Sequence, residues 1–186
     1  MQLHLNFDKL MKNLLITTCL LFAFNCHAQW ISKTSCSKRA AMITNEAIES
    51  RLNVEPLIAL GQAKAALILD PNCGCAKILI AGLGSSNEDW GSRKEKLEGI
   101  DRSSLSGEEK AWYDILIASD SLVKEKLNVA LASYPNSPMF NYFSVGEDVN
   151  ASIAFVEKFP KYASPALNSI TYGYGRGEDV TADYAK

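Results

Sequence analysis

The chain has 186 residues, with 19 Lys and Arg against 21 Asp and Glu, a formal net charge of −2. This slightly acidic balance offers no basic face of the kind that binds nucleic acid, so we expect no nucleic-acid partner. Its two histidines, His4 and His27, both lie in the segment 1–28. If that segment is removed, Ser-His-Asp and Cys-His nucleophiles and imidazole-bound zinc are excluded, and we expect neither a metal nor another cofactor.

The segment 1–28 has the pattern of a secretory signal peptide. Lys12 precedes an uncharged apolar run from Leu14 to Phe24, and the small residue Ala28 offers a cleavage point. The run is about half of the ~20 residues that span a bilayer, so we expect no membrane span. We predict cleavage before Gln29 and export to the periplasm or the cell exterior. Either Met11 or the first residue can be the start.

The remaining residues, 29–186, are the size of one domain, and their apolar spacing is helical. Pro56 suits the first turn of a helix, and Pro71 ends one because proline cannot continue the hydrogen-bond ladder. Ser106 and Glu109 have the spacing of a capping box. Alternating β-branched runs are almost absent, so the predicted fold class is all-α. Helices are expected near residues 37–52, 55–69, 75–83, 87–98 and 121–133, and from Ser106 onward.

An internal repeat suggests how these helices are organised. The hexapeptide Gly146-Glu-Asp-Val-Asn-Ala151 recurs at 177–182, an offset of 31, with five of six positions identical. The second helix of each expected pair starts near residues 55, 88, 120, 147 and 178. A period close to thirty residues with two helices per unit is typical of helical repeat proteins.

Small residues occur where paired helices cross closely, at Ala47, Ala59 and Ala66, and Pro71 closes the unit. With the similar segment 159–174, these positions resemble the tetratricopeptide-repeat (TPR) family. The resemblance extends from about residue 37 to the end of the chain. It is strong at both ends and weak in the centre, where HEAT-like or irregular repeats are the alternative.

This resemblance implies antiparallel helix pairs stacked as a TPR-like right-handed superhelix, an α-solenoid. Residues 29–186 would form about four and a half pairs, the last of them incomplete. Arrays of this kind normally end in a complete capping helix, so we expect that the chain is truncated after Lys186 relative to similar proteins.

In the TPR family the first helix of each pair lines a concave groove that holds a partner segment. By register, Asn141 and Asn168 face this groove, and Tyr172 lies one turn further on. The asparagine amide both donates to and accepts from a peptide backbone, and tyrosine adds rigid contact area. The resemblance therefore implies a non-catalytic scaffold for a protein or peptide partner. The alternatives are a hydrolase that acts on glycans with carboxylates alone, and the N-terminal fragment of a larger protein.

Three cysteines follow the predicted signal peptide, Cys36, Cys73 and Cys75. An oxidising compartment permits disulfides in an exported protein. Cys36 opens the first helix and Cys73 follows the second, and these two ends are neighbours in an antiparallel pair. We predict a Cys36–Cys73 disulfide, with Cys75 as the alternative partner. The lone Cys-x-Cys spacing is only a weak indication of a metal site.

Overall fold

The computed structural model describes residues 29–83, 90–146, 148–167 and 171, and all regular structure in these ranges is helical. This confirms the all-α fold class. The elements are α2 (Lys38–Leu52), α3 (Pro56–Leu69), α4 (Gly74–Leu83), α5 (Trp90–Glu98), η1 (Arg102–Ser104), α6 (Gly107–Ile117), α7 (Asp120–Ser133), α8 (Pro138–Val145), α9 (Val149–Lys158) and η2 (Pro160–Tyr162). Within these ranges no helix is both long and apolar enough to span a membrane. The predicted signal peptide, the second hexapeptide and the chain end lie outside the described residues.

The predicted capping box and the hexapeptide both lie at helix ends. Ser106 and Glu109 form the capping box at the start of α6. The first hexapeptide copy ends one helix and starts the next. Gly146, with a φ of 60°, follows α8 in a conformation that favours glycine. The Asp148 side chain then accepts a hydrogen bond from the Ala151 N–H (2.9 Å) at the start of α9. The hexapeptide is thus a helix-to-helix junction.

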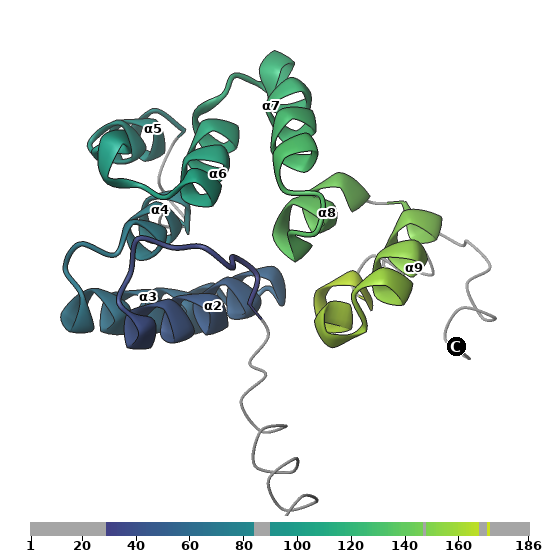
Figure 1. Cartoon of the computed structure of the whole chain (residues 1–186), viewed down its shortest axis with the longest axis horizontal. Coiled ribbons are helices and arrows are strands. Elements are labelled where there is room, and N and C mark those ends of the chain that lie inside the picture. Colours follow the sequence, from purple (N-terminus) through teal and green to yellow (C-terminus); the bar gives the residue numbers. More distant parts are fainter. Residues whose placement is uncertain (1–28, 84–89, 147, 168–170, 172–186) are drawn as a thin grey trace, which may run out of the picture.

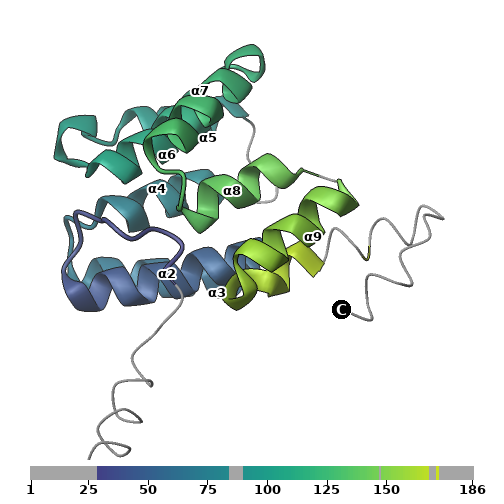
Figure 2. The same cartoon turned by 45° about the vertical axis from the view of Figure 1, so that its right-hand side comes forward.

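The helices are arranged as successive neighbours, as in a helical repeat. Each α-helix packs against the next along the chain, and α4 also contacts α2 and α6 (Figures 1 and 2). The first helices of the four pairs, α2, α4, α6 and α8, begin at positions 38, 74, 107 and 138. The spacing between successive starts is therefore 36, then 33, then 31, which is close to the period expected from the sequence.

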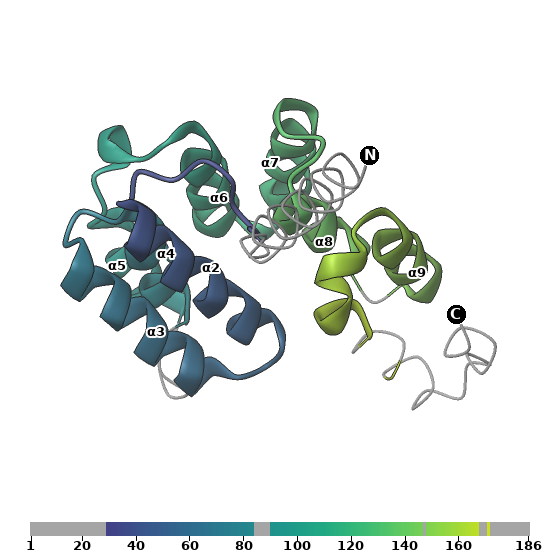
Figure 3. The ribbon, with the colours of Figure 1, turned by 60° about the horizontal axis from the view of Figure 1, so that its bottom comes forward.

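The first pair, α2 and α3, is held together through small side chains. Ala59, Ala63 and Ala66 of α3 are fully buried, as are Ala40 and Ala47 of α2. Figure 3 shows the two helices side by side over their whole length. Alanine on both sides allows the helix axes to approach closely, and burial removes the methyl groups from water. Ala47, Ala59 and Ala66 are the three small positions expected from the sequence.

One end of this pair is closed covalently and by hydrogen bonds. Cys36 and Cys73, the pair favoured from the sequence, are joined in a disulfide. Beside it the Asp70 carboxylate accepts from the Ser37 N–H (2.6 Å) and the Asn72 N–H (3.0 Å). These two backbone hydrogen bonds lower the pKa of Asp70. The segment before α2 is thereby fixed to the segment after α3.

Cys75 is a buried free thiol. Burial raises its pKa well above the ordinary value, and the nearby carboxylates of Glu109 and Glu108 raise it further. The thiol is therefore protonated and shielded at pH 8, and alkylation requires the thiolate. We expect iodoacetamide to leave Cys75 unmodified in the native protein, but to label it alone among residues 29–186 after unfolding without reductant. Peptide mapping by mass spectrometry measures both. Labelling of Cys36 or Cys73 before reduction would contradict this arrangement.

Candidate binding groove

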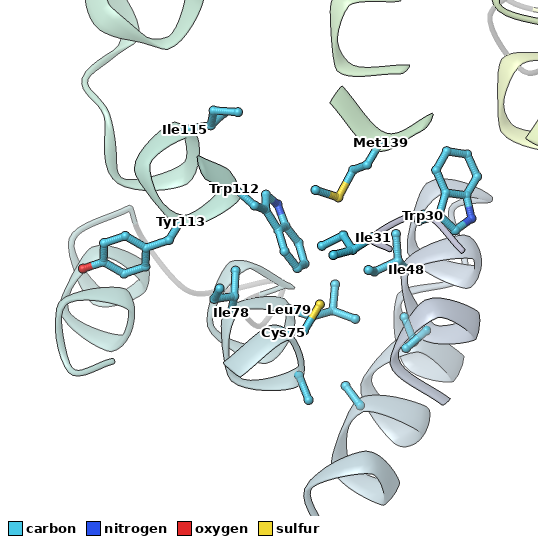
Figure 4. Packing of buried hydrophobic residues seen from close by; sticks show 14 of the residues in the cluster. Trp30, Ile31, Ile48, Cys75, Ile78, Leu79, Trp112, Tyr113, Ile115 and Met139 are labelled. Atoms are coloured by element: carbon cyan, nitrogen blue, oxygen red, sulfur yellow. The ribbon is translucent and has the colours of Figure 1, made fainter. Parts of the chain in front are cut away.

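The residues that precede α2 form a strap without regular secondary structure, residues 29–36, that crosses the inner side of the helix array. It runs between α2 and the helices α4 and α6 (Figures 1 and 2). Trp30 and Ile31 at its start are 0% and 1% exposed. Figure 4 shows Ile31 among Trp112, Ile48 and Met139, which come from α6, α2 and α8. The strap therefore lies where the first helices of the pairs converge.

Trp30 joins the strap to the last helices of the described array. Its ring centroid lies 4.8 Å from that of Tyr162, 5.9 Å from Tyr142 and 6.4 Å from Phe155. The Gln29 N–H donates to the Tyr162 hydroxyl (2.8 Å), which donates to the Gln29 carbonyl (3.1 Å). The pairs with Tyr162 and Tyr142 are edge-to-face and the pair with Phe155 is stacked. Aromatic pairs of these kinds each contribute roughly 0.5–1.5 kcal/mol beyond area burial. The start and the far end of the array are thus in contact.

Asn45 of α2 holds the backbone of the strap. Its Oδ1 accepts from the Ile31 N–H (3.0 Å), and its Nδ2 donates to the Ile31 carbonyl (3.3 Å). Asn45 is 4% exposed, so these bonds satisfy an amide that would otherwise be costly to bury. Asn45, a residue of the first helix α2, thus binds the strap through both the backbone N–H and the backbone carbonyl of Ile31.

Two buried carboxylates hold the rest of the strap, and Glu108 is the first of them. It is 2% exposed, and its Oε2 accepts from the Ser32 N–H (3.0 Å), the Ser32 hydroxyl (3.1 Å) and the Lys33 N–H (3.0 Å). Charge-assisted hydrogen bonds of this kind are the strong ones. Glu108 therefore fastens the middle of the strap to the first turn of α6.

Glu109, the second carboxylate, is fully buried. Its Oε2 accepts from the backbone N–H groups of Ser35 (3.0 Å) and Ser106 (2.7 Å). Its Oε1 accepts from the Cys75 N–H (2.9 Å) and the Ser35 hydroxyl (3.1 Å). Ser35 of the strap lies so close to the start of α4 that a Cβ on Gly74 would be only 2.9 Å from Ser35 Oγ. Glu109 thus joins the strap to the starts of α4 and α6.

Beside the strap, the first helices leave an open cavity of about 310 Å³. Apart from Val54, all of its lining residues belong to α2, α4, α6 and α8. The indole N–H of Trp112 is buried and finds no acceptor in the described part of the chain. Arg51 is exposed, and no described carboxylate forms an ion pair with it. The lining is Ile48, Arg51, Leu52, Val54, Leu79, Gly82, Leu83, Trp112, Leu116, Met139, Tyr142 and Phe143.

Val54 lines the end of this cavity in a strained conformation. Its φ is 65°, a rare value for a β-branched residue, and its side chain is 63% exposed. A backbone outlier of this kind costs of order 1–3 kcal/mol and is enriched at functional sites. The strained residue is therefore part of the cavity lining.

Of the groove residues expected from the sequence, Asn141 is the one in a described range. It lies on the first helix α8, but it does not line the cavity. Its amide nitrogen donates to the carbonyls of Pro135 (3.1 Å) and Ser137 (2.8 Å), and its oxygen accepts from Lys158 Nζ (2.9 Å). These bonds join α8 to its own preceding turn and to α9. Asn168 and Tyr172 lie outside the described residues, so partner binding by these three residues remains a prediction.

Sequence reasoning missed the residues that hold the strap. Asn45 could have been singled out from the sequence, since it is a polar residue next to the apolar stripe of its helix. So could the apolar pair Trp30-Ile31, directly after the predicted cleavage site. Glu109 was identified as a cap, but its bonds to Ser35 and Cys75 join residues far apart in the sequence and leave no local pattern.

Among the described residues, no group of three or more His, Cys, Asp or Glu side chains could hold a metal ion. Comparison of the chain with protein-family models, with curated proteins and with solved structures finds no match.

Removing the Trp30 ring tests whether the strap stabilises the whole array. Trp30→Ala should lower the free energy of unfolding by about 3–5 kcal/mol, the usual loss for a large buried aromatic side chain. Urea unfolding followed by circular dichroism measures it. Lys33→Ala is the matched control, because this strap side chain is exposed and its loss should change stability by less than about 0.5 kcal/mol. Equal stability of both variants would show that the strap contributes little.

Proposed function

We propose that the chain is a non-catalytic protein–protein interaction scaffold that binds a partner segment along the inner side of a TPR-like superhelix. The observation that carries this proposal is the cavity, which is lined almost entirely by the first helices of four successive pairs. An inner surface shared by the first helices is the arrangement that the TPR resemblance implies. Extended concave surfaces of this kind are what helical repeats use for binding.

The cavity also indicates the chemistry of its partner segment. Its walls are aliphatic and aromatic, which suits a large apolar side chain. Arg51, an exposed residue of the lining, can form an ion pair with a carboxylate of the segment. We propose an extended segment with a bulky apolar residue close to an acidic one. The strap supports this mode, since Asn45 already holds the Ile31 backbone on the same side of the array.

A binding role agrees better with the buried carboxylates than a glycosidase role does. A carboxylate-only hydrolase needs an acid and a base that face one another across a cleft. No carboxylate lines the cavity among the described residues. A second hollow, of about 410 Å³, includes Glu108, but its Oε2 is occupied by hydrogen bonds from Ser32 and Lys33. Glu108 and Glu109 are therefore better explained as structural residues.

We propose the periplasm or the cell exterior as the place where this scaffold acts. Residues 1–28 have the pattern of a signal peptide, and disulfides such as Cys36–Cys73 persist mainly in oxidising compartments.

Filling the cavity tests the proposed function. Gly82 lines the cavity, and a Cβ there would meet Leu116 at an ordinary contact distance of 3.4 Å. Gly82→Leu should therefore occupy the cavity without removing any core side chain, whereas Gly82→Ala leaves most of it open. On an array of overlapping 15-residue segments from the exported proteins of its host, the native chain and Gly82→Ala should bind the same segments. Gly82→Leu should bind them at least about tenfold more weakly, as isothermal titration measures.

Arg51→Glu should reduce binding of the acidic segments in particular, because it reverses the charge at the cavity edge. Equal binding by the Gly82→Leu variant and the native chain, or no segment bound by a native chain shown to be folded, would contradict the proposal.

A further inference from the structure

The outer side of α3 is an apolar surface that no described residue covers. Leu57 and Ile68 are each 83% exposed, Ile58 is 53% exposed and Leu69 is 48% exposed. The opposite side of the same helix is buried against the array. A helix that is apolar all round is normally covered on every side. Figure 3 shows α3 along the outer edge of the molecule.

The exposed apolar residues have a symmetric arrangement along the helix. Counting outward from Ala63, which faces the core, Leu57 corresponds to Leu69, Ile58 to Ile68, and Gly61 to Ala65. At 100° per residue these six positions share a stripe roughly 120° wide. We call these six residues the α3 stripe. Its large residues lie at the two ends and its small residues lie in the middle.

We infer that the α3 stripe is the interface of a homodimer, in which α3 of a second copy packs antiparallel across a twofold axis. A twofold interface is made by one surface twice, so it must be complementary to itself. In this arrangement the Leu57-Ile58 end of one copy meets the Ile68-Leu69 end of the other. Gly61 and Ala65 lie at the crossing, where small residues allow the helix axes to approach closely.

The chemistry of α3 favours a second copy over an unlike partner. Lys64, at the edge of the stripe, is the only charged residue between Pro56 and Leu69. An acidic or basic partner would find almost no complementary charge there. A membrane-surface helix normally keeps a charged face toward water, whereas the other face of α3 is packed against the protein. Because bulky apolar residues lie at both ends of the stripe, each end of one copy meets a matching apolar end of an antiparallel second copy.

Gly61 provides an independent observation. A Cβ at this position would meet nothing within 4 Å in the single chain, so the monomer does not need a glycine there. Glycine is the least favourable residue for a helix interior after proline. A close helix crossing does favour a small residue, glycine or alanine, at this point. The inference concerns the outer side of the molecule and does not depend on the proposed groove.

The dimer is tested with two substitutions of Gly61 in the protein produced from the full sequence. Sedimentation velocity from 0.1 to 100 μM (concentrations on the order needed for a dimer of modest affinity) should show a reversible monomer–dimer equilibrium. Gly61→Glu should weaken the dimer at least about tenfold while the monomer stays folded, because glutamate favours helix and has room in the single chain. Gly61→Ala should retain the dimer. Val129→Glu, at an exposed apolar position of α7, is the matched control and should also retain it.

The antiparallel register has its own test. A mixture of the Leu57→Cys and Ile68→Cys variants should form an intermolecular disulfide on oxidation, whereas Leu57→Cys alone should not. A native chain that is monomeric at every concentration overturns the inference and leaves the stripe to an unlike partner or to residues outside the described ranges. A dimer unaffected by Gly61→Glu, or a cross-link in Leu57→Cys alone, overturns it as well.

Discussion

The buried carboxylate of Glu109 is the interaction on which the rest of this structure depends. An ionised group moved out of water loses several kcal/mol of solvation, and it is tolerated only where donors replace the water. Four donors do so here: three backbone N–H groups and one hydroxyl. The Cys75 N–H lies in the first turn of α4 and the Ser106 N–H at the start of α6, where helix dipoles favour a negative charge. One side chain therefore fixes the starts of two successive first helices relative to the strap.

The strap changes how this array of helices behaves. In an ordinary repeat protein each unit contacts only its neighbours, so stability is close to a sum of local terms. Here the strap contacts α2 through Asn45, α6 through Glu108 and Glu109, and the region of α8, α9 and η2 through Trp30. Ser164 also donates to the Asn53 side chain after α2 (2.8 Å). These contacts link distant pairs, so we expect the array to unfold as one unit rather than pair by pair. They also fill part of the inner surface, so a partner of the proposed kind would have only the remaining cavity to occupy.

The sequence was informative where structure depends on neighbours along the chain. The helix boundaries at Pro56 and Ser106 were predicted well, because proline and capping residues act within one turn. The strap was not predicted, because a short segment without periodicity carries no secondary-structure signal. The Asn45 bonds to Ile31 and the Glu109 bonds to Cys75 depend on tertiary approach. The groove position of Asn141 came from family register, but its hydrogen bonds join it to Lys158 and to nearby carbonyls.

The inner cavity and the α3 stripe lie on different sides of the first helix pair, and Val54 lies in the turn between the two helices of that pair. It lines the cavity, closely precedes α3, and exposes most of its side chain. Its positive φ would suit glycine or asparagine better, and its backbone N–H bond to the Arg51 carbonyl (3.2 Å) places no demand on the side chain. The described fold therefore gives a strained, exposed valine no structural role. The proposed groove supplies one, since a segment bound in the cavity that Val54 lines would cover this side chain. Burial of the Val54 side chain would remove apolar surface from water, and this gain would offset part of the free-energy cost of its positive φ.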